Sequence, residues 1–158
     1  MQSLLKISDA VNLAMHASAI MAGELGRPIS AKELAHRLAA SEATLSKAMQ
    51  RLVRADLLSS TRGPAGGFFL AREAKEITLK EIVEAIEGKL STPGCLFGRQ
   101  ICGRSECILG DSVALAHGIL EERLASTTLD QISISLNGAK HQKRKVPRKP
   151  IKRKRAAK

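Results

Sequence analysis

The three cysteines offer the most distinctive chemistry in this sequence. Cys95, Cys102 and Cys107 are the only cysteines of the chain and lie in the segment GCLFGRQICGRSEC, with the spacing C-x6-C-x4-C. Thiolates are preferred ligands of soft metal centres, and the intervening glycines let backbone N–H groups approach sulfur. An odd number of cysteines, in a chain without a recognisable export signal, argues against a framework of structural disulfides. The segment therefore predicts a metal-binding loop.

The cysteine spacing does not by itself identify the metal. It matches neither the C-x2-C pairs of zinc fingers nor the cysteine runs of ferredoxins, so zinc and an iron–sulfur cluster both remain open. Arg99 and Arg104 lie beside the cysteines and favour the thiolate form, which also leaves a thiol redox switch open.

A second group of residues is suited to reading DNA. Apolar residues recur at helical spacing after the N-cap residue Ser41, namely Leu45, Ala48, Met49, Leu52 and Val53. Polar side chains occupy the other faces of this predicted helix, namely Thr44, Ser46, Lys47, Gln50 and Arg54. A shorter helix precedes it, opened by the capping-box pattern Ser30–Glu33 and apolar at Leu34, Ala35 and Leu38. Two helices this close together predict a helix-turn-helix, whose second helix enters the major groove.

A glycine-rich hairpin follows the two helices. Residues 57–61 and 68–71 are predicted strands, joined by the tip RGPAGG. Helix, turn, helix and hairpin is the order of a winged helix, and Arg62 at the base of the wing can reach a minor groove or a phosphate. The predicted DNA contacts are therefore Thr44, Ser46, Lys47, Gln50, Arg62 and Gly63. The alternative is a packed helical hairpin without a ligand.

Other elements must hold these sites in place. A mostly buried helix is predicted over 8–23, a polar connector over 71–77, and a helix from the capping box Thr78–Glu81 to Gly88. A further capping box, Thr128–Gln131, opens a last short helix. The predicted fold is mainly α with a small β-hairpin wing, divided into a winged helix-turn-helix domain (1–88), a cysteine loop (89–107), a dimerisation helix with the short helix (108–135) and a basic tail (136–158).

The dimerisation helix is predicted from a long apolar stripe. Its members are Leu109, Val113, Ala116, Leu120 and Leu124, with Leu115 and Ile119 beside them. Such a stripe outside a small domain needs a partner, and a second copy of the chain is expected because readers of two-fold operators are generally dimeric. The alternative is a helix that folds back on its own domain.

The net charge of +11 comes from one end of the 158-residue chain. Residues 140–158 contain eleven Lys and Arg and no Asp or Glu, so the rest of the chain is neutral. This tail is expected to be disordered and to attract phosphates without sequence preference. A purely solubilising role is the alternative.

Composition excludes several other classes. No run of 18 apolar residues and no secretory signal occur, so a cytoplasmic protein without a membrane span is expected. The chain has no Trp or Tyr and only three Phe, which argues against platforms for single-stranded nucleic acid and favours duplex DNA. No nucleophile–base pair or phosphate loop is found, so an enzyme is not expected.

The stretch from Ser41 to Gly88, with the wing signature RGPAGGF, the three cysteines and a helix ending in STTLDQI, resembles the IscR/NsrR-type family of bacterial winged-helix regulators. The resemblance covers residues 4–132. It implies a homodimer that binds palindromic promoter DNA and holds a 2Fe-2S or 4Fe-4S cluster on Cys95, Cys102 and Cys107. In this family the state of the cluster alters the affinity for DNA.

The fourth cluster ligand is where the sequence departs from part of the family. One branch uses a histidine three residues after the third cysteine, a position that is Gly110 here. In the nitric-oxide-sensing branch an Asp from the other subunit serves, and Asp9 matches its position. The alternative for Asp9 is a carboxylate favoured by the helix dipole, and His117 is interpreted as a helix-surface residue. A loosely DNA-binding, nucleoid-type protein with structural zinc or a thiol redox site remains the alternative function.

Overall fold

The computed structural model describes residues 7–24, 27–63, 66–91 and 109–138, with side chains to 133. The predicted cysteine ligands and the charged part of the basic tail, residues 140–158, lie outside these residues, whereas residues 136–138 belong to the last helix. The helices are α1 (Asp9–Gly23), α2 (Ala31–Leu38), α3 (Glu42–Arg54), η1 (Ala74–Glu76), α4 (Leu79–Glu87), α5 (Gly110–Ser126) and α6 (Leu129–Gly138). Strands β1 (Leu58–Thr61) and β2 (Gly67–Leu70) form a two-stranded antiparallel sheet. The prediction of a mainly α fold with a hairpin wing is confirmed.

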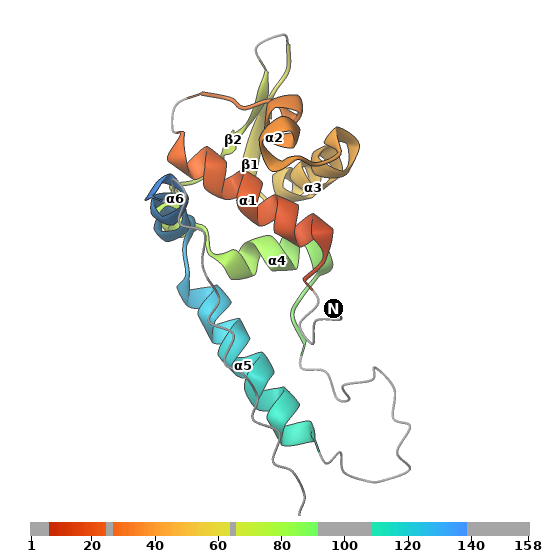
Figure 1. The fold of residues 1–158 in the computed structure, drawn as a ribbon, viewed down its shortest axis with the longest axis vertical. Helices are drawn as coiled ribbons and strands as arrows, with labels where there is room; N and C mark the ends of the chain where they lie inside the picture. The colour runs from red at the N-terminus through yellow and green to blue at the C-terminus, as the bar shows by residue number, and fades with distance from the viewer. Residues whose placement is uncertain (1–6, 25–26, 64–65, 92–108, 139–158) are drawn as a thin grey trace, which may run out of the picture.

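Helix α1 lies at the centre of the core and packs against α3, α4 and α6 (Figure 1). It is rich in small residues because other helices approach it from several sides. The core is completed by larger apolar side chains from the surrounding elements, among them Leu34, Leu45, Met49, Leu52, Ile82 and Leu129, each fully buried. Burial of each such side chain stabilises the fold by roughly 1.5–3 kcal/mol.

The wing is attached to the segment that leads into α2. Strand β2 pairs with β1, and Phe68 also forms an isolated bridge with Ile29 through two backbone hydrogen bonds of 2.9 Å. A side chain at Gly67 would lie 2.5 Å from the carbonyl of Ile29. Glycine is therefore required at this position for the two segments to meet. The bridge ties the hairpin to the helix-turn-helix.

The helix starts follow the capping residues seen in the sequence. Thr78 and Glu81 form a complete capping box at the start of α4. Ser30 accepts a hydrogen bond from the backbone N–H of Glu33 at 3.1 Å, but the Glu33 carboxylate binds arginines instead. At α6, the hydroxyl of Thr128 donates to the carboxylate of Asp130.

The connector over residues 71–77 is more structured than its polar composition suggested. It contains the short helix η1, and its last residue, Ile77, is 1% exposed. The carbonyl of Ile77 accepts a hydrogen bond of 3.0 Å from the N–H of Leu129. An isolated apolar residue in a polar segment gave no periodicity, so the sequence did not reveal this anchor.

Helix α5 extends away from the rest of the molecule, whereas α6 returns to lie beside α1 (Figure 1). No residue of α5 is buried. Leu109, predicted to begin its stripe, is the N-cap residue and is 46% exposed. Among the helices of the described ranges, none is long and apolar enough to cross a membrane.

Candidate nucleic-acid interface

A tight turn connects α2 to α3, the second helix of the predicted helix-turn-helix and its recognition helix. Ala39 adopts a left-handed conformation with φ of 50°, and the N–H of Ala40 donates to the carbonyl of Ala35 at 2.9 Å. Ser41 then caps α3, accepting from the N–H of Thr44 at 3.5 Å. Only Ala39 and Ala40 separate the end of α2 from the N-cap of α3, so the turn is short, as the sequence predicted.

The outer face of α3 is polar and solvent-exposed. Thr44, Lys47, Gln50 and Arg54 are exposed, whereas Ser46 is half-buried. Within the described residues, no hydrogen bond or ion pair engages the side chains of Lys47, Gln50 or Arg54. Opposite them, Leu45, Ala48, Met49 and Leu52 hold α3 in the core. The helix thus presents donors and acceptors that the fold itself does not use.

The wing presents a second exposed cation. Arg62 and Gly63 follow β1 directly, and both are exposed. Gly63 has a φ of 111°, which favours glycine, and a side chain at Gly66 would collide with the backbone carbonyl of Thr61 at 2.4 Å. The glycines of the wing signature therefore shape the turn. The guanidinium of Arg62 has no partner in the part of the chain that the structure describes.

Arg51 is a positioning residue that the sequence did not single out. It belongs to α3, but its Nη1 atom donates a 2.7 Å hydrogen bond to the backbone carbonyl of Ile86 near the end of α4. This bond satisfies one of the carbonyls left free at a helix end and links α3 to α4. Only the three-dimensional packing brings these residues together, since they are 35 positions apart.

A network of ion pairs joins the end of α1 to α2. Arg27 binds Glu33 at 2.8 Å and Glu24 at 2.5 Å, while Arg37 binds Glu33 at 2.7 Å and also contacts Glu24. The hydrogen bond from Arg37 lowers the pKa of Glu24, and that from Arg27 lowers the pKa of Glu33. Both carboxylates therefore stay ionised to lower pH, and the network supports the orientation of α2.

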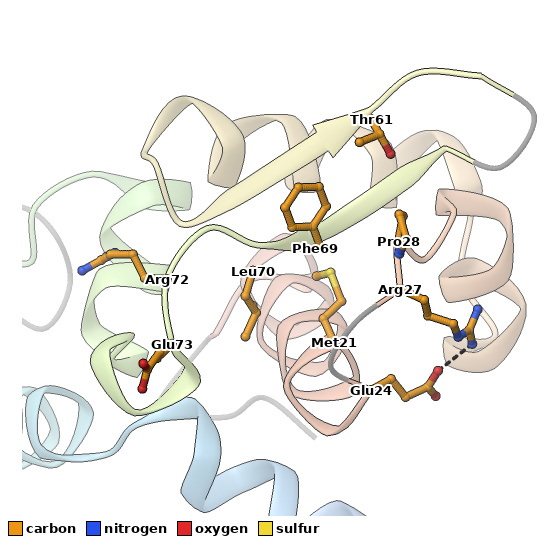
Figure 2. Close-up of a pocket in the computed structure, with 9 residues that line it drawn as sticks. All are labelled: Met21, Glu24, Arg27, Pro28, Thr61, Phe69, Leu70, Arg72 and Glu73. Atoms are coloured by element: carbon orange, nitrogen blue, oxygen red, sulfur yellow. Dashed lines mark hydrogen bonds and ion pairs between the residues drawn. The ribbon is translucent and has the colours of Figure 1, made fainter.

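A groove of about 520 Å³ lies between α1 and the hairpin. Met21, Pro28, Phe69 and Leu70 form its apolar lining, and Phe69 is 38% exposed. Figure 2 shows the guanidinium groups of the two arginines at its ends directed away from Phe69. None of the predicted DNA contacts lines this groove.

The candidate metal site is described only in part. Asp9 is exposed in the first turn of α1, and no other described residue pairs with its carboxylate. Gly110 is the first residue of α5, which stands apart from the start of α1 in Figure 1. His117 is not simply on the surface: its side chain is 17% exposed and its Nδ1 lies 3.7 Å from Glu121. No group of three or more His, Cys, Asp or Glu side chains that could hold a metal ion occurs among the described residues.

A buried helical core, a helix-turn-helix with a free polar face and a cationic hairpin together define a winged helix-turn-helix protein. Comparison with known proteins agrees. Residues 7–134 match the Rrf2 family, described as iron-dependent transcriptional regulators. The chain belongs to this family, which confirms the resemblance drawn from the sequence.

Individual relatives give the same assignment. The chain is 32% identical over 82 residues to the HTH-type transcriptional regulator IscR of Photorhabdus laumondii, an alignment that spans 51% of this chain and 49% of the relative. The chain thus spans about half the length of such curated relatives. An HTH-type regulator of Aquifex aeolicus is 30% identical, with 73% of this chain and 77% of the relative covered.

Solved structures extend the similarity over most of the chain. The IscR structure from T. potens superposes with a TM-score of 0.68 at 28% identity, covering 87% of this chain and 93% of that one. CymR, the global cysteine regulator of B. subtilis, gives 0.68 at 28% identity over 82% and 98%.

Proposed function

We propose that this chain is a homodimeric DNA-binding regulator of transcription in which α3 reads the major groove and the wing contacts the backbone or minor groove. The observation that carries this proposal is the exposed polar face of α3, where Lys47 and Gln50 make no side-chain hydrogen bond or ion pair with other described residues. The guanidinium of Arg62 on the wing is likewise without a partner among the described residues. Polar and cationic groups of this kind read base edges and phosphates. The predicted contacts are Thr44, Ser46, Lys47, Gln50, Arg62 and Gly63, of which Ser46 is the most shielded.

The test is the affinity for an operator selected from random duplex DNA, measured by fluorescence anisotropy at fixed salt. Arg62→Ala should weaken binding by about 1–3 kcal/mol if the guanidinium reads the groove. Lys75→Ala is the matched control, because Lys75 lies away from α3 in η1 and pairs with Glu73. Equal affinity of the Arg62 and Lys75 variants would rule out a role for the Arg62 guanidinium in binding.

The dimer is proposed to form through α5. Leu115 and Ile119 are 67% and 61% exposed and lie one turn apart on this helix. Such large apolar side chains normally lie against a partner, and a second copy buries the same residues twice by symmetry. A dimer also fits a palindromic operator, since its two-fold axis coincides with that of the DNA.

The proposed sensor is an iron–sulfur cluster held by Cys95, Cys102 and Cys107, with Asp9 of the partner subunit as the fourth ligand. The family description as iron-dependent supports it, and the carboxylate of Asp9 is exposed and has no partner among the described residues. When bound, the cluster supplies redox chemistry and reacts with small molecules such as oxygen or nitric oxide. A carboxylate is a hard donor and holds iron less firmly than a thiolate, which leaves one corner exchangeable.

Visible absorption of anaerobically purified protein tests the sensor. Charge-transfer bands are expected for the wild type and for Asp9→Ala, with altered absorption or altered reaction with nitric oxide in the variant. Ser in place of any of the three cysteines should abolish the bands. A colourless protein containing zinc would instead support a structural metal site. If Asp9→Ala matches wild type in absorption and in reaction with nitric oxide, Asp9 is only a residue of the helix start.

The basic tail is proposed to add sequence-independent affinity. Residues 140–158 carry eleven positive charges, and each phosphate that they neutralise releases counterions. Deletion of these residues should flatten the dependence of the dissociation constant on salt, while base preference stays the same. An unchanged salt slope would favour the solubilising role.

A further inference from the structure

Helix α5 is pinned to the DNA-binding part of the chain near its C-terminal end. The N–H of Leu79 donates to the carbonyl of Thr127 at 2.9 Å, and the N–H of Leu129 donates to that of Ile77 at 3.0 Å. These bonds join the residues that flank α4 and α6. They fix the position of one end of α5, and its direction depends on the contacts that α5 makes with α4 along its length.

A side-chain clasp lies further along the helix. Lys80, in the first turn of α4, donates from Nζ to Oε1 of Glu121 at 2.6 Å. Glu84 lies 4.0 Å from the same ammonium, and His117 faces Oε2 of Glu121 at 3.7 Å. The hydrogen bond raises the pKa of Lys80 and lowers that of Glu121. We call Lys80 and Glu121 the α4–α5 clasp.

The other side of α4 packs into the core. Ile82 and Ile86 are buried in the core, and Arg51 of the recognition helix bonds to the carbonyl of Ile86. Helix α4 therefore moves with α3 as one body. Since α5 has no buried residue, the joint between α4 and α5 is the place where the recognition helix can turn relative to the proposed dimer axis.

The dimensions of α5 make this joint sensitive. At 1.5 Å per residue, Glu121 lies about 9 Å from the pin at Thr127, and Leu115 of the proposed dimer contact lies about 18 Å from it. A shift of about 1 Å at the clasp thus becomes about 2 Å at Leu115. Because both protomers of a two-fold dimer move, the two shifts together are comparable with the rise of one base pair, about 3.4 Å.

We propose that Lys80 and Glu121 are positioning residues that set the distance between the two recognition helices, and hence the half-site spacing that the dimer accepts. This inference rests on the proposed function, because it requires a dimer that binds a two-fold operator. Neither residue lies on α3 or the wing, so their effect is expected on spacing preference rather than on base preference.

The experiment compares the affinity for a selected operator with that for operators lengthened or shortened by one base pair between the half-sites. Wild type should prefer the native spacing. Lys80→Glu, which places like charges together, should reduce the ratio of affinities by about two- to fivefold, the range of a partly exposed ion pair. The double variant Lys80→Glu with Glu121→Lys should restore the ratio. Lys75→Glu is the control, since Lys75 and Glu73 also meet at 2.6 Å but do not join α4 to α5.

The outcomes separate the two levels of the proposal. If wild type selects no operator, the proposed function fails and this inference fails with it. If wild type prefers one spacing and Lys80→Glu keeps the same ratio as Lys75→Glu, only the inference is overturned. An equal loss of affinity at every spacing would assign the clasp to stability, which thermal unfolding of the same variants checks.

Discussion

Helices α3 and α5 both expose much of their surface, but they do so for opposite reasons. Helix α3 buries four residues in the core and shows solvent a polar face. Helix α5 buries none, and its most exposed large side chains are Leu115 and Ile119. The surroundings of α3 are therefore complete within one chain, whereas α5 leaves large apolar side chains uncovered among the described residues. A single chain forms α3 and the wing, and we propose that the regulator is a dimer of two chains.

The largest expected effect comes from a substitution in the buried face of α3. Leu45 of α3 is 0% exposed, so Leu45→Ala leaves a cavity in the core and should cost about 2–5 kcal/mol of unfolding free energy. Urea denaturation measures this loss. Ile7→Ala, at a position 54% exposed and outside the proposed dimer contact, is the matched control. A loss at Ile7 as large as that at Leu45 would mean that the cost does not come from a core cavity.

A double charge substitution tests the exposed apolar surface of α5. Leu115→Glu with Ile119→Glu should dissociate the dimer, because two carboxylates per chain would be buried against each other. Light scattering should then give the mass of one chain, and the denaturation midpoint should no longer depend on protein concentration. A variant that remains dimeric would place the dimer interface elsewhere.

The wing can be weakened without touching its charges. In Gly67→Ala the new methyl group would lie 2.5 Å from the carbonyl of Ile29, so the bridge to α2 must open. We expect a cost of about 1–3 kcal/mol, the usual range for overpacking. Gly118→Ala, in α5, meets no atom within 4 Å and should instead gain up to about 1 kcal/mol from helix propensity. A Gly67→Ala protein as stable as wild type would show that the methyl group does not disturb the bridge to Ile29.

Substitution of Ser18 is expected to have a smaller effect and to increase the free energy of unfolding. It is 1% exposed in α1, and its Oγ has no hydrogen-bond partner among the described residues. Removal of an unsatisfied buried hydroxyl should stabilise the fold, so Ser18→Ala should gain about 1 kcal/mol. The same urea titration measures it. A destabilised variant would show that the hydroxyl finds a partner in solution.

The smallest effect concerns the ion pairs before α2. Because Arg37 lowers the pKa of Glu24 in the folded state, the ionised carboxylate adds stability above the unfolded pKa, near 4.5, and this is lost as the pH falls through the folded value. The difference in unfolding free energy between wild type and Glu24→Gln should therefore be present at pH 7 and shrink as the pH falls below the unfolded pKa of 4.5. A difference that is constant with pH would exclude the ionised carboxylate as its source.

The sequence predicted the elements whose signals are local. The apolar spacing in α3, the caps at Ser41 and Thr78 and the glycines of the wing placed the helix-turn-helix and hairpin within about one residue, since each signal acts within a few positions along the chain. Side chains that meet across long separations were not predictable in this way. Arg51 with Ile86, and Lys80 with Glu121, depend on how α4 packs against its neighbours.

The candidate site shows the same division. Exposure of Lys47, Gln50 and Arg62 followed from the helical period and the hairpin pattern. The half-buried state of His117, whose Nδ1 lies 3.7 Å from Glu121 one turn along α5, did not follow from the apolar spacing. The ligands Cys95, Cys102 and Cys107 remain a prediction, made from residue type and family resemblance.

The central claim is that two copies of α3 and the wing read a two-fold DNA site. The most direct measurement is to sequence the duplexes that wild-type protein retains from a random pool at physiological salt. We predict enrichment of an inverted repeat whose half-sites are one helical turn, or a multiple of it, apart. Retention of duplexes without any enriched sequence, or of a single asymmetric site, would contradict the claim.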